Sequence, residues 1–151
     1  MATTIGNETD PVDLFNNLIQ LDYDAISAYQ AAIDRLDDAG DKAKLTEFMA
    51  DHQRHTQDLA GLVSSLGGTP ATEGDIKAML TKGKVVLADL MGDKAILKAM
   101  KTNEDDTNTA YERAAGRTDL PAGALPVVER NLEDERRHRA WIEQRIAALG
   151  G

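Results

Sequence analysis

Hydrophobic residues recur at intervals of three and four along four separate segments of this 151-residue chain, and this spacing constrains the fold most strongly. It predicts long amphipathic helices rather than strands. Aromatic residues make up only 4% of the chain, with 12 glycines and 4 prolines, which also disfavours a turn-rich β-sandwich. The helices are expected at about residues 11–38, 41–66 and 93–115, and in a last segment that follows a glycine- and proline-containing loop at 116–126.

The lengths of the connections predict how these helices are arranged. A short break at Gly40 separates the first two, whereas the chain between the second and third is long and carries a short amphipathic segment at about 73–91, interrupted at Gly83. Two short connections and one long crossover predict an all-α four-helix bundle of two antiparallel hairpins. One domain is therefore expected over residues 11–151, preceded by a flexible tail at residues 1–10.

Composition excludes several classes of function. The 26 acidic residues outnumber the 17 basic ones, giving a net charge of −9, so nucleic acid and anionic membrane surfaces are not expected partners. The absence of cysteine excludes disulfides, iron–sulfur ligation and thiol nucleophiles. No apolar run approaches the ~20 residues needed to span a bilayer, and no targeting segment is recognisable, so a cytoplasmic location is expected.

Ionisable residues interrupt the apolar stripes in two matching halves of the chain. Each half carries an acid and, seven residues later, a tyrosine. Farther along, each half carries two ionisable residues three positions apart, of which the second is a histidine. The acid-to-histidine interval is 33 residues in the first half and 34 in the second. The repeat comprises Asp22, Tyr29, His52 and His55 in the first half, and Glu104, Tyr111, Glu135 and His138 in the second.

Burying three carboxylates in one core requires a partner for their charge. Without one, each costs several kcal/mol or becomes protonated. Metal cations are well suited to keep Asp22, Glu104 and Glu135 ionised together, and oxygen with imidazole ligands suits iron, manganese or zinc. An isolated histidine is more often a hydrogen-bonded core residue, but all three histidines of the chain fall within the repeat. The pattern therefore favours a metal site formed by Asp22, His52, His55, Glu104, Glu135 and His138.

This pattern resembles the ferritin-like superfamily, especially the bacterioferritin and rubrerythrin branch, and also a small bacterial ferritin-like family of undefined function. The residues Leu132-Glu-Asp-Glu135-Arg-Arg-His138-Arg-Ala-Trp141-Ile142-Glu resemble the metal-binding fourth helix of bacterioferritins. The resemblance implies two iron ions and a reaction of Fe(II) with O2 or peroxide by ferroxidase or rubrerythrin-like chemistry.

The resemblance also implies roles for individual residues. Glu135 would bridge the metals, Asp22 and Glu104 would be terminal ligands, and His55 and His138 would each bind one metal. Tyr29 and Tyr111 would hydrogen-bond to ligands, as core tyrosines also do without a metal.

Two residues depart from the family pattern. Asp22 stands where the family has a glutamate, and His52 stands where it has a bridging glutamate, so the site is expected to hold an asymmetric metal pair or a single ion. Asp51 lies about 100° around the helix from His52 and is a weaker ligand candidate.

These departures keep alternatives open. One is a non-catalytic bundle that binds metal for stability, storage or partner recognition, and another is a bundle that binds no metal. A homodimer is compatible with the amphipathic crossover, and the absence of a fifth terminal helix gives no support for a large storage cage.

Overall fold

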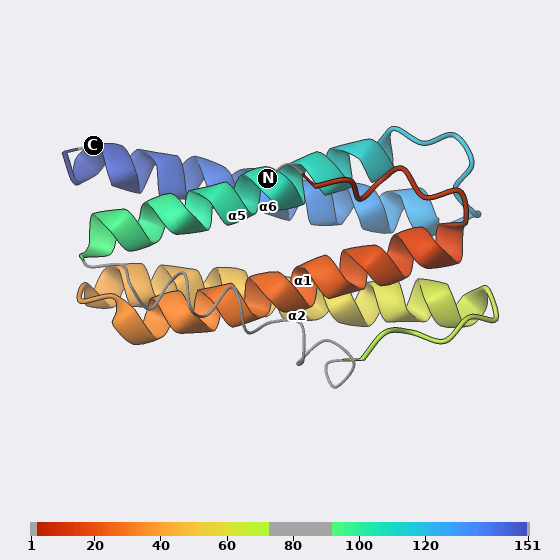
Figure 1. Ribbon diagram of the computed structural model, residues 1–151, viewed down its shortest axis with the longest axis horizontal. Coiled ribbons are helices and arrows are strands. Elements are labelled where there is room, and N and C mark those ends of the chain that lie inside the picture. Colours follow the sequence, from red (N-terminus) through yellow and green to blue (C-terminus); the bar gives the residue numbers. More distant parts are fainter. Residues whose placement is uncertain (1–2, 73–91, 151) are drawn as a thin grey trace.

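The computed structural model describes residues 3–72 and 92–150, which form four long helices and no strand. This confirms the all-α prediction. Figure 1 shows the helices lying side by side along the long axis of the molecule. The helices are α1 (Pro11–Arg35), α2 (Ala39–Ser65), α5 (Asp93–Ala115) and α6 (Ala124–Ala148).

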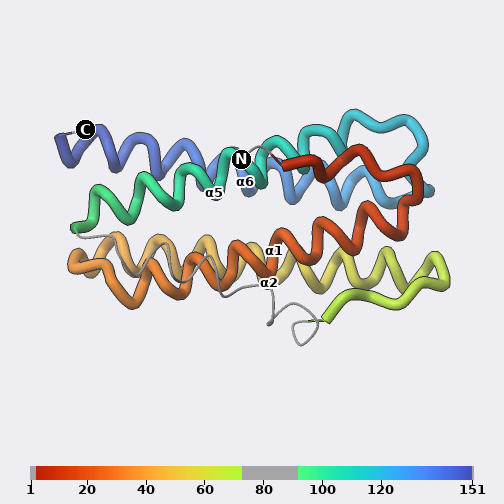
Figure 2. Tube along the Cα trace, in the orientation of Figure 1, coloured from red at the N-terminus to blue at the C-terminus, as the bar shows by residue number. Residues whose placement is uncertain are grey.

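The chain forms two antiparallel hairpins, as expected. Helix α1 packs mainly against α2, and α5 packs mainly against α6. Figure 2 shows that α2 ends at the opposite end of the bundle from the start of α5, so these two helices run parallel. The short amphipathic segment predicted at about 73–91 lies outside the described residues.

The connection between α1 and α2 differs from the prediction. Helix α1 ends at Arg35, and α2 begins before Gly40 instead of after it. The reason is Asp38, whose side chain accepts a hydrogen bond from the backbone N–H of Asp41 at 2.8 Å and so caps the helix. The Asp93 carboxylate also accepts hydrogen bonds from the backbone N–H groups of Asp37 and Asp38, which ties the turn to the start of α5.

The loop between α5 and α6 is shorter than predicted, because α6 begins at Ala124 and includes Pro126 in its first turn. A proline fits there because its missing N–H has no partner within the helix at that position. Two leucines at the ends of helices are exposed, Leu66 at 39% and Leu125 at 38%.

The apolar core is divided into two clusters of buried residues. Polar side chains at the middle of the helices separate the clusters. Apolar residues on both sides therefore shield these polar side chains from solvent. One cluster contains Leu14, Phe15, Leu18, Ile19, Leu59, Val63, Ala110, Tyr111, Ala114, Ala124, Val128 and Leu132, and the other contains Ala25, Tyr29, Ala31, Ala32, Leu36, Leu45, Phe48, Ile96, Leu97, Met100 and Ile142.

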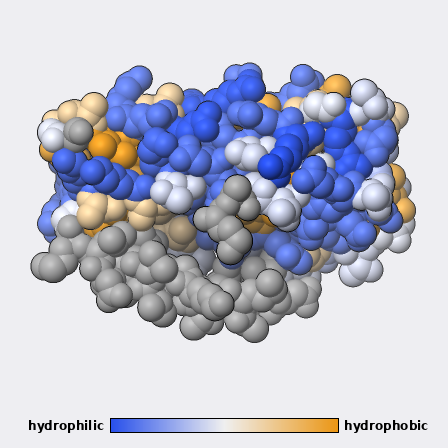
Figure 3. Space-filling view, turned by 45° about the horizontal axis from the view of Figure 1, so that its top comes forward, coloured by the Kyte–Doolittle hydropathy of each residue, from blue (hydrophilic) through white to orange (hydrophobic). Residues whose placement is uncertain are grey.

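The N-terminal residues that the structure describes contact α5. The Arg113 guanidinium donates to the backbone carbonyls of Thr3 at 2.6 Å and Ile5 at 3.3 Å. Flexibility of residues 1–10 stays a prediction. Figure 3 shows one face of the molecule, on which hydrophilic residues predominate and hydrophobic residues form small separate areas. None of the described helices is both long enough and apolar enough to cross a membrane.

The cap at Asp38 predicts the effect of two substitutions. Asp38→Ala removes the side-chain acceptor and should lower the free energy of unfolding by about 1 kcal/mol, measured by urea denaturation. Asp38→Asn keeps an equally good capping oxygen and should stay close to the unmodified protein. Equal destabilisation by both substitutions would contradict the role of the cap and point to the charge instead.

Candidate metal centre

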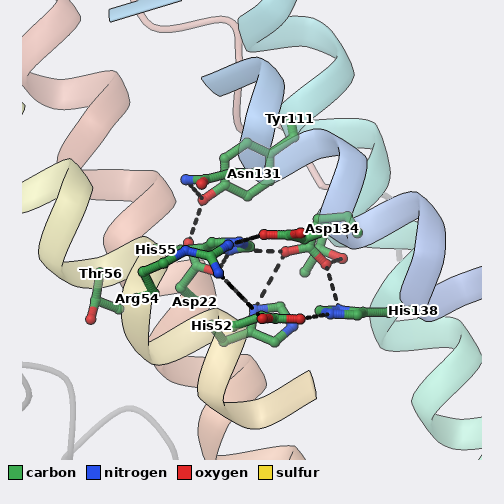
Figure 4. Close-up of polar contacts among 12 residues, drawn as sticks. Asp22, His52, Arg54, His55, Thr56, Tyr111, Asn131, Asp134 and His138 are labelled. Atoms are coloured by element: carbon green, nitrogen blue, oxygen red, sulfur yellow. Dashed lines mark hydrogen bonds and ion pairs between the residues drawn. The ribbon is translucent and has the colours of Figure 1, made fainter. Parts of the chain in front are cut away.

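All six predicted metal-ligating residues meet at the middle of the bundle, and each is 0% exposed to solvent. Every helix contributes at least one of them. At this height of the bundle, each of the four helices has a polar residue on the face that is otherwise apolar and points to the bundle axis. Figure 4 shows the three histidines around the space between the helices. We call this set the polar layer, and its members are Asp22 from α1, His52 and His55 from α2, Glu104 from α5, and Glu135 and His138 from α6.

One half of the polar layer is a group of four residues around Asp22. Its Oδ1 lies 2.7 Å from Nδ1 of His52 and 3.1 Å from Nδ1 of His55. Oε1 of Glu135 lies 3.4 Å from both of these nitrogens. Each of the four residues offers one ligand atom within 4.8 Å of the others, a spacing close enough to hold a metal ion. We call these residues the Asp22 group.

The other half is a similar group around Glu104. Oε1 of Glu104 lies 3.3 Å from Nε2 of His52 and 3.4 Å from Nδ1 of His138. Oε2 of Glu135 lies 3.6 Å from the same His138 nitrogen. This Glu104 group also has its ligand atoms within 4.8 Å of one another. His52 and Glu135 therefore belong to both groups.

The two tyrosines of the repeat hold the carboxylates from across the bundle. The hydroxyl of Tyr29 on α1 donates to Glu104 on α5, and the hydroxyl of Tyr111 on α5 donates to Asp22 on α1. Burial and the neighbouring carboxylate raise the pKa of each tyrosine well above its usual value, so both keep the proton that they donate. The predicted hydrogen bonds between these tyrosines and candidate ligands are thus present.

Thr107 adds a hydrogen bond that joins α5 to α6. Its hydroxyl lies 3.0 Å from Oε2 of Glu104 and 3.0 Å from Oε2 of Glu135. The hydroxyl thus lies between the Oε2 atoms of the two glutamates, while both Oε1 atoms face histidines and Oε2 of Glu135 also faces His138.

Two further aspartates hold the outer nitrogens of the histidines. Asp134 on α6 contacts Nε2 of His55 on α2 at 2.9 Å, and Asp51 on α2 contacts Nε2 of His138 on α6 at 2.8 Å. Metal-binding histidines commonly use such a partner to fix the ring and leave the other nitrogen for the metal. Asp51 is thus placed to orient His138, whereas the sequence suggested it as a weak ligand candidate. The role of Asp134 was not predicted from the sequence.

A signal for both aspartates exists in the sequence. Each precedes its own helix's histidine by four residues, in Asp51-His-Gln-Arg-His55 and Asp134-Glu-Arg-Arg-His138. The aspartate contacts the histidine of the opposite helix, however, and only the packing of α2 against α6 reveals that pairing.

Arginines cover these aspartates at the surface. Arg54 pairs with Asp134, and Arg137 donates to Asp51 at 2.6 Å and to Asp134 at 3.2 Å. The bonds from His55 and Arg137, with the charge of Arg54, hold the pKa of Asp134 below its usual range although burial acts to raise it. The aspartates therefore stay ionised beside the histidines.

The metal-free polar layer balances its carboxylates with protonated histidines. An ionised carboxylate only accepts hydrogen bonds, so a ring nitrogen that hydrogen-bonds to one is the donor. Burial alone would lower the pKa of His52, but the charge of Glu135 and hydrogen bonds to Asp22 and Glu104 raise it to about 9. Burial is outweighed in the same way at the other two rings, where the pKa rises to about 11 for His55 and about 10 for His138.

The carboxylates respond in opposite directions. For Asp22, burial acts to raise the pKa, but the charge of His55 and hydrogen bonds from His52 and His55 lower it. The neighbouring rings of His138 and His52 lower the pKa of Glu104 despite its burial. Glu135 has a raised pKa, because it is buried and lies near the charge of Glu104. Glu135 is thus the carboxylate that most lacks a compensating charge.

Two buried atoms in the polar layer make no hydrogen bond, and they test whether a metal fits. These atoms are Oε1 of Glu135 and Nδ1 of His138. Buried polar atoms usually have a partner, and each of these faces a group of possible ligand atoms. Carboxylate oxygen with imidazole nitrogen is a donor set suited to iron, manganese or zinc. The residues present therefore fit a metal.

Comparison with known proteins identifies one family. No curated protein and no solved structure matches the chain. A family model matches residues 10–116, which is more than half of the chain and includes Asp22, His52, His55 and Glu104. The match ends before Glu135 and His138. The chain belongs to the family described as Domain of unknown function (DUF2383).

Proposed function

We propose that the polar layer binds two iron ions and that the protein is a ferritin-like oxidoreductase that reacts Fe(II) with O2 or peroxide. The observation that carries this proposal is the pair of overlapping ligand groups that share Glu135. The resemblance to bacterioferritins and rubrerythrins, in which two carboxylate–histidine sites share such a glutamate, supports iron as the metal.

The residues divide between the two ions by geometry. Asp22 and His55 would hold one ion, and Glu104 and His138 would hold the other, because the facing atoms of each pair lie within 3.4 Å. Glu135 would contribute to both ions, since its Oε1 faces the first group and its Oε2 faces the second. Asp134 and Asp51 keep the outer histidine nitrogens occupied, which aims Nδ1 of each ring at its ion.

Charge supports two ions rather than none. Three carboxylates bring a charge of −3 into a buried layer, and two divalent ions bring +4, so the carboxylates are compensated without protonated histidines. A single divalent ion would leave part of the carboxylate charge to protonated histidines.

The surroundings suit redox chemistry at a bound metal. Bound iron would supply the electron transfer, which no side chain of the polar layer provides. The apolar clusters at both ends keep bulk water away from the layer. Tyr29 and Tyr111 hold the terminal carboxylates in fixed orientations and keep their own protons. The chain thus contributes a rigid, dry set of ligands.

A second function is favoured by the two departures from the family pattern. Asp22 is one methylene shorter than glutamate, and His52 replaces a carboxylate that could bridge. Such a site suits metal bound for stability, storage or partner recognition, with manganese or zinc as alternatives to iron.

Metal content tests the ligand set. The unmodified protein, loaded with Fe(II) without oxygen, should hold two ions per chain by elemental analysis. Glu135→Ala should weaken binding of both ions by at least about 100-fold, and His55→Ala should weaken one, since each removes a direct ligand.

The matched control for these variants is Glu133→Ala, because Glu133 is an exposed carboxylate on the same helix. It should keep two ions. Full occupancy in both Glu135→Ala and His55→Ala would show that iron binds elsewhere.

Aerobic oxidation separates the two functions. Fe(II) added to the metal-free protein in air should oxidise at least ten times faster than in buffer, with an absorption characteristic of a di-iron centre. Stopped-flow absorbance provides the measurement. Uptake of iron with no acceleration would support the non-catalytic function and contradict the oxidoreductase.

A further inference from the structure

His52 is the residue at which this chain departs most from the family pattern, and its two ring nitrogens face different ligand groups. Nδ1 lies 2.7 Å from Oδ1 of Asp22 and belongs to the Asp22 group. Nε2 lies 3.3 Å from Oε1 of Glu104 and belongs to the Glu104 group. The ring therefore spans the boundary between the two halves of the polar layer.

Aromatic neighbours hold the ring in this orientation. Its centroid lies 5.3 Å from that of Tyr29, 5.4 Å from that of His55 and 5.2 Å from that of His138. The side chain is completely buried. A rotation that took either nitrogen out of its group would have to displace one of these rings, so the two-sided placement is built into the packing.

Both nitrogens are also available to metals without loss of another partner. Each faces only carboxylates, all of which are themselves candidate ligands: Asp22 and Glu135 at Nδ1, and Glu104 at Nε2. His55 and His138 differ, because Nε2 of each ring contacts an aspartate outside the polar layer. His52 is thus the histidine of this chain with both nitrogens turned inward.

We propose that His52 bridges the two metals as an imidazolate, with Nδ1 bound to the ion of the Asp22 group and Nε2 bound to the ion of the Glu104 group. This inference rests on the dimetal site proposed above. Each ring nitrogen that binds a metal ion gives up any proton that it carries, and that proton passes to solvent. No electron is transferred in this step.

The bridge would set the distance between the metals. The lone pairs of the two ring nitrogens diverge in the plane of the ring, whereas the oxygens of a carboxylate can direct lone pairs to the same side. An imidazolate therefore holds two ions farther apart than a bridging glutamate would. Glu135, with one oxygen facing each group, remains as the second connection.

The competing arrangement leaves one proton on His52. In that case one nitrogen binds a metal and the other donates a hydrogen bond to a carboxylate. The two arrangements differ in the number of ring N–H groups, which can be counted because the chain has only three histidines.

The test is nitrogen NMR of the Zn(II)-loaded protein with 15N-labelled histidine. A bridging His52 predicts two protonated ring nitrogens, Nε2 of His55 and Nε2 of His138, and four without a proton. A third N–H that belongs to His52 would overturn the bridge. Zinc content below two ions per chain would also overturn it.

His52→Glu and His52→Gln provide matched comparisons. His52→Glu restores a bridging carboxylate and should keep two zinc ions with two N–H groups, and the signals that it removes identify His52. His52→Gln cannot bridge as an anion and should bind the second zinc at least tenfold more weakly. If the unmodified protein binds two zinc ions but shows a third histidine N–H, only the bridge is refuted. Anaerobic titration with Fe(II) decides separately whether the core binds iron.

Discussion

The structure depends on the pairing of opposite charges inside a bundle core. Three carboxylates and three histidines lie completely buried at one level of the helices, where an uncompensated charge would cost several kcal/mol. Protonated histidines satisfy the carboxylates in the metal-free chain. Apolar clusters at both ends confine this charge to a thin layer. A divalent ion is the natural replacement for these protons, because it brings more charge to the same ligand atoms.

Contacts that cross the bundle give the polar layer its approximate two-fold symmetry. Tyr29 and Tyr111 each hold the acid of the other hairpin, and Asp51 and Asp134 each hold the histidine of the facing helix. Ligand orientation therefore depends on how the two hairpins dock, and not on either hairpin alone. His52 breaks the symmetry, since the matching position in the second half is Glu135. Asp22, which matches Glu104, is the other difference, so any difference between the two proposed metal positions should originate at these two residues.

Much of the fold and of the site could be predicted from the sequence. Spacing of apolar residues located the long helices, and the same spacing placed all six candidate ligands on inward-facing stripes. The ends of helices were less predictable, because a capping side chain such as Asp38 outweighs the glycine two residues later. The Asp134 contact could not be predicted, because a polar residue at the edge of a stripe is ordinary until the facing helix brings a histidine to it.

Anomalous X-ray diffraction from crystals of the Fe(II)-loaded protein tests most directly whether the polar layer holds two metal ions. We expect two iron peaks in the bundle core, one among Asp22, His55 and Glu135 and one among Glu104, His138 and Glu135. Iron peaks found only at surface carboxylates, with the polar layer empty at saturating Fe(II), would contradict it.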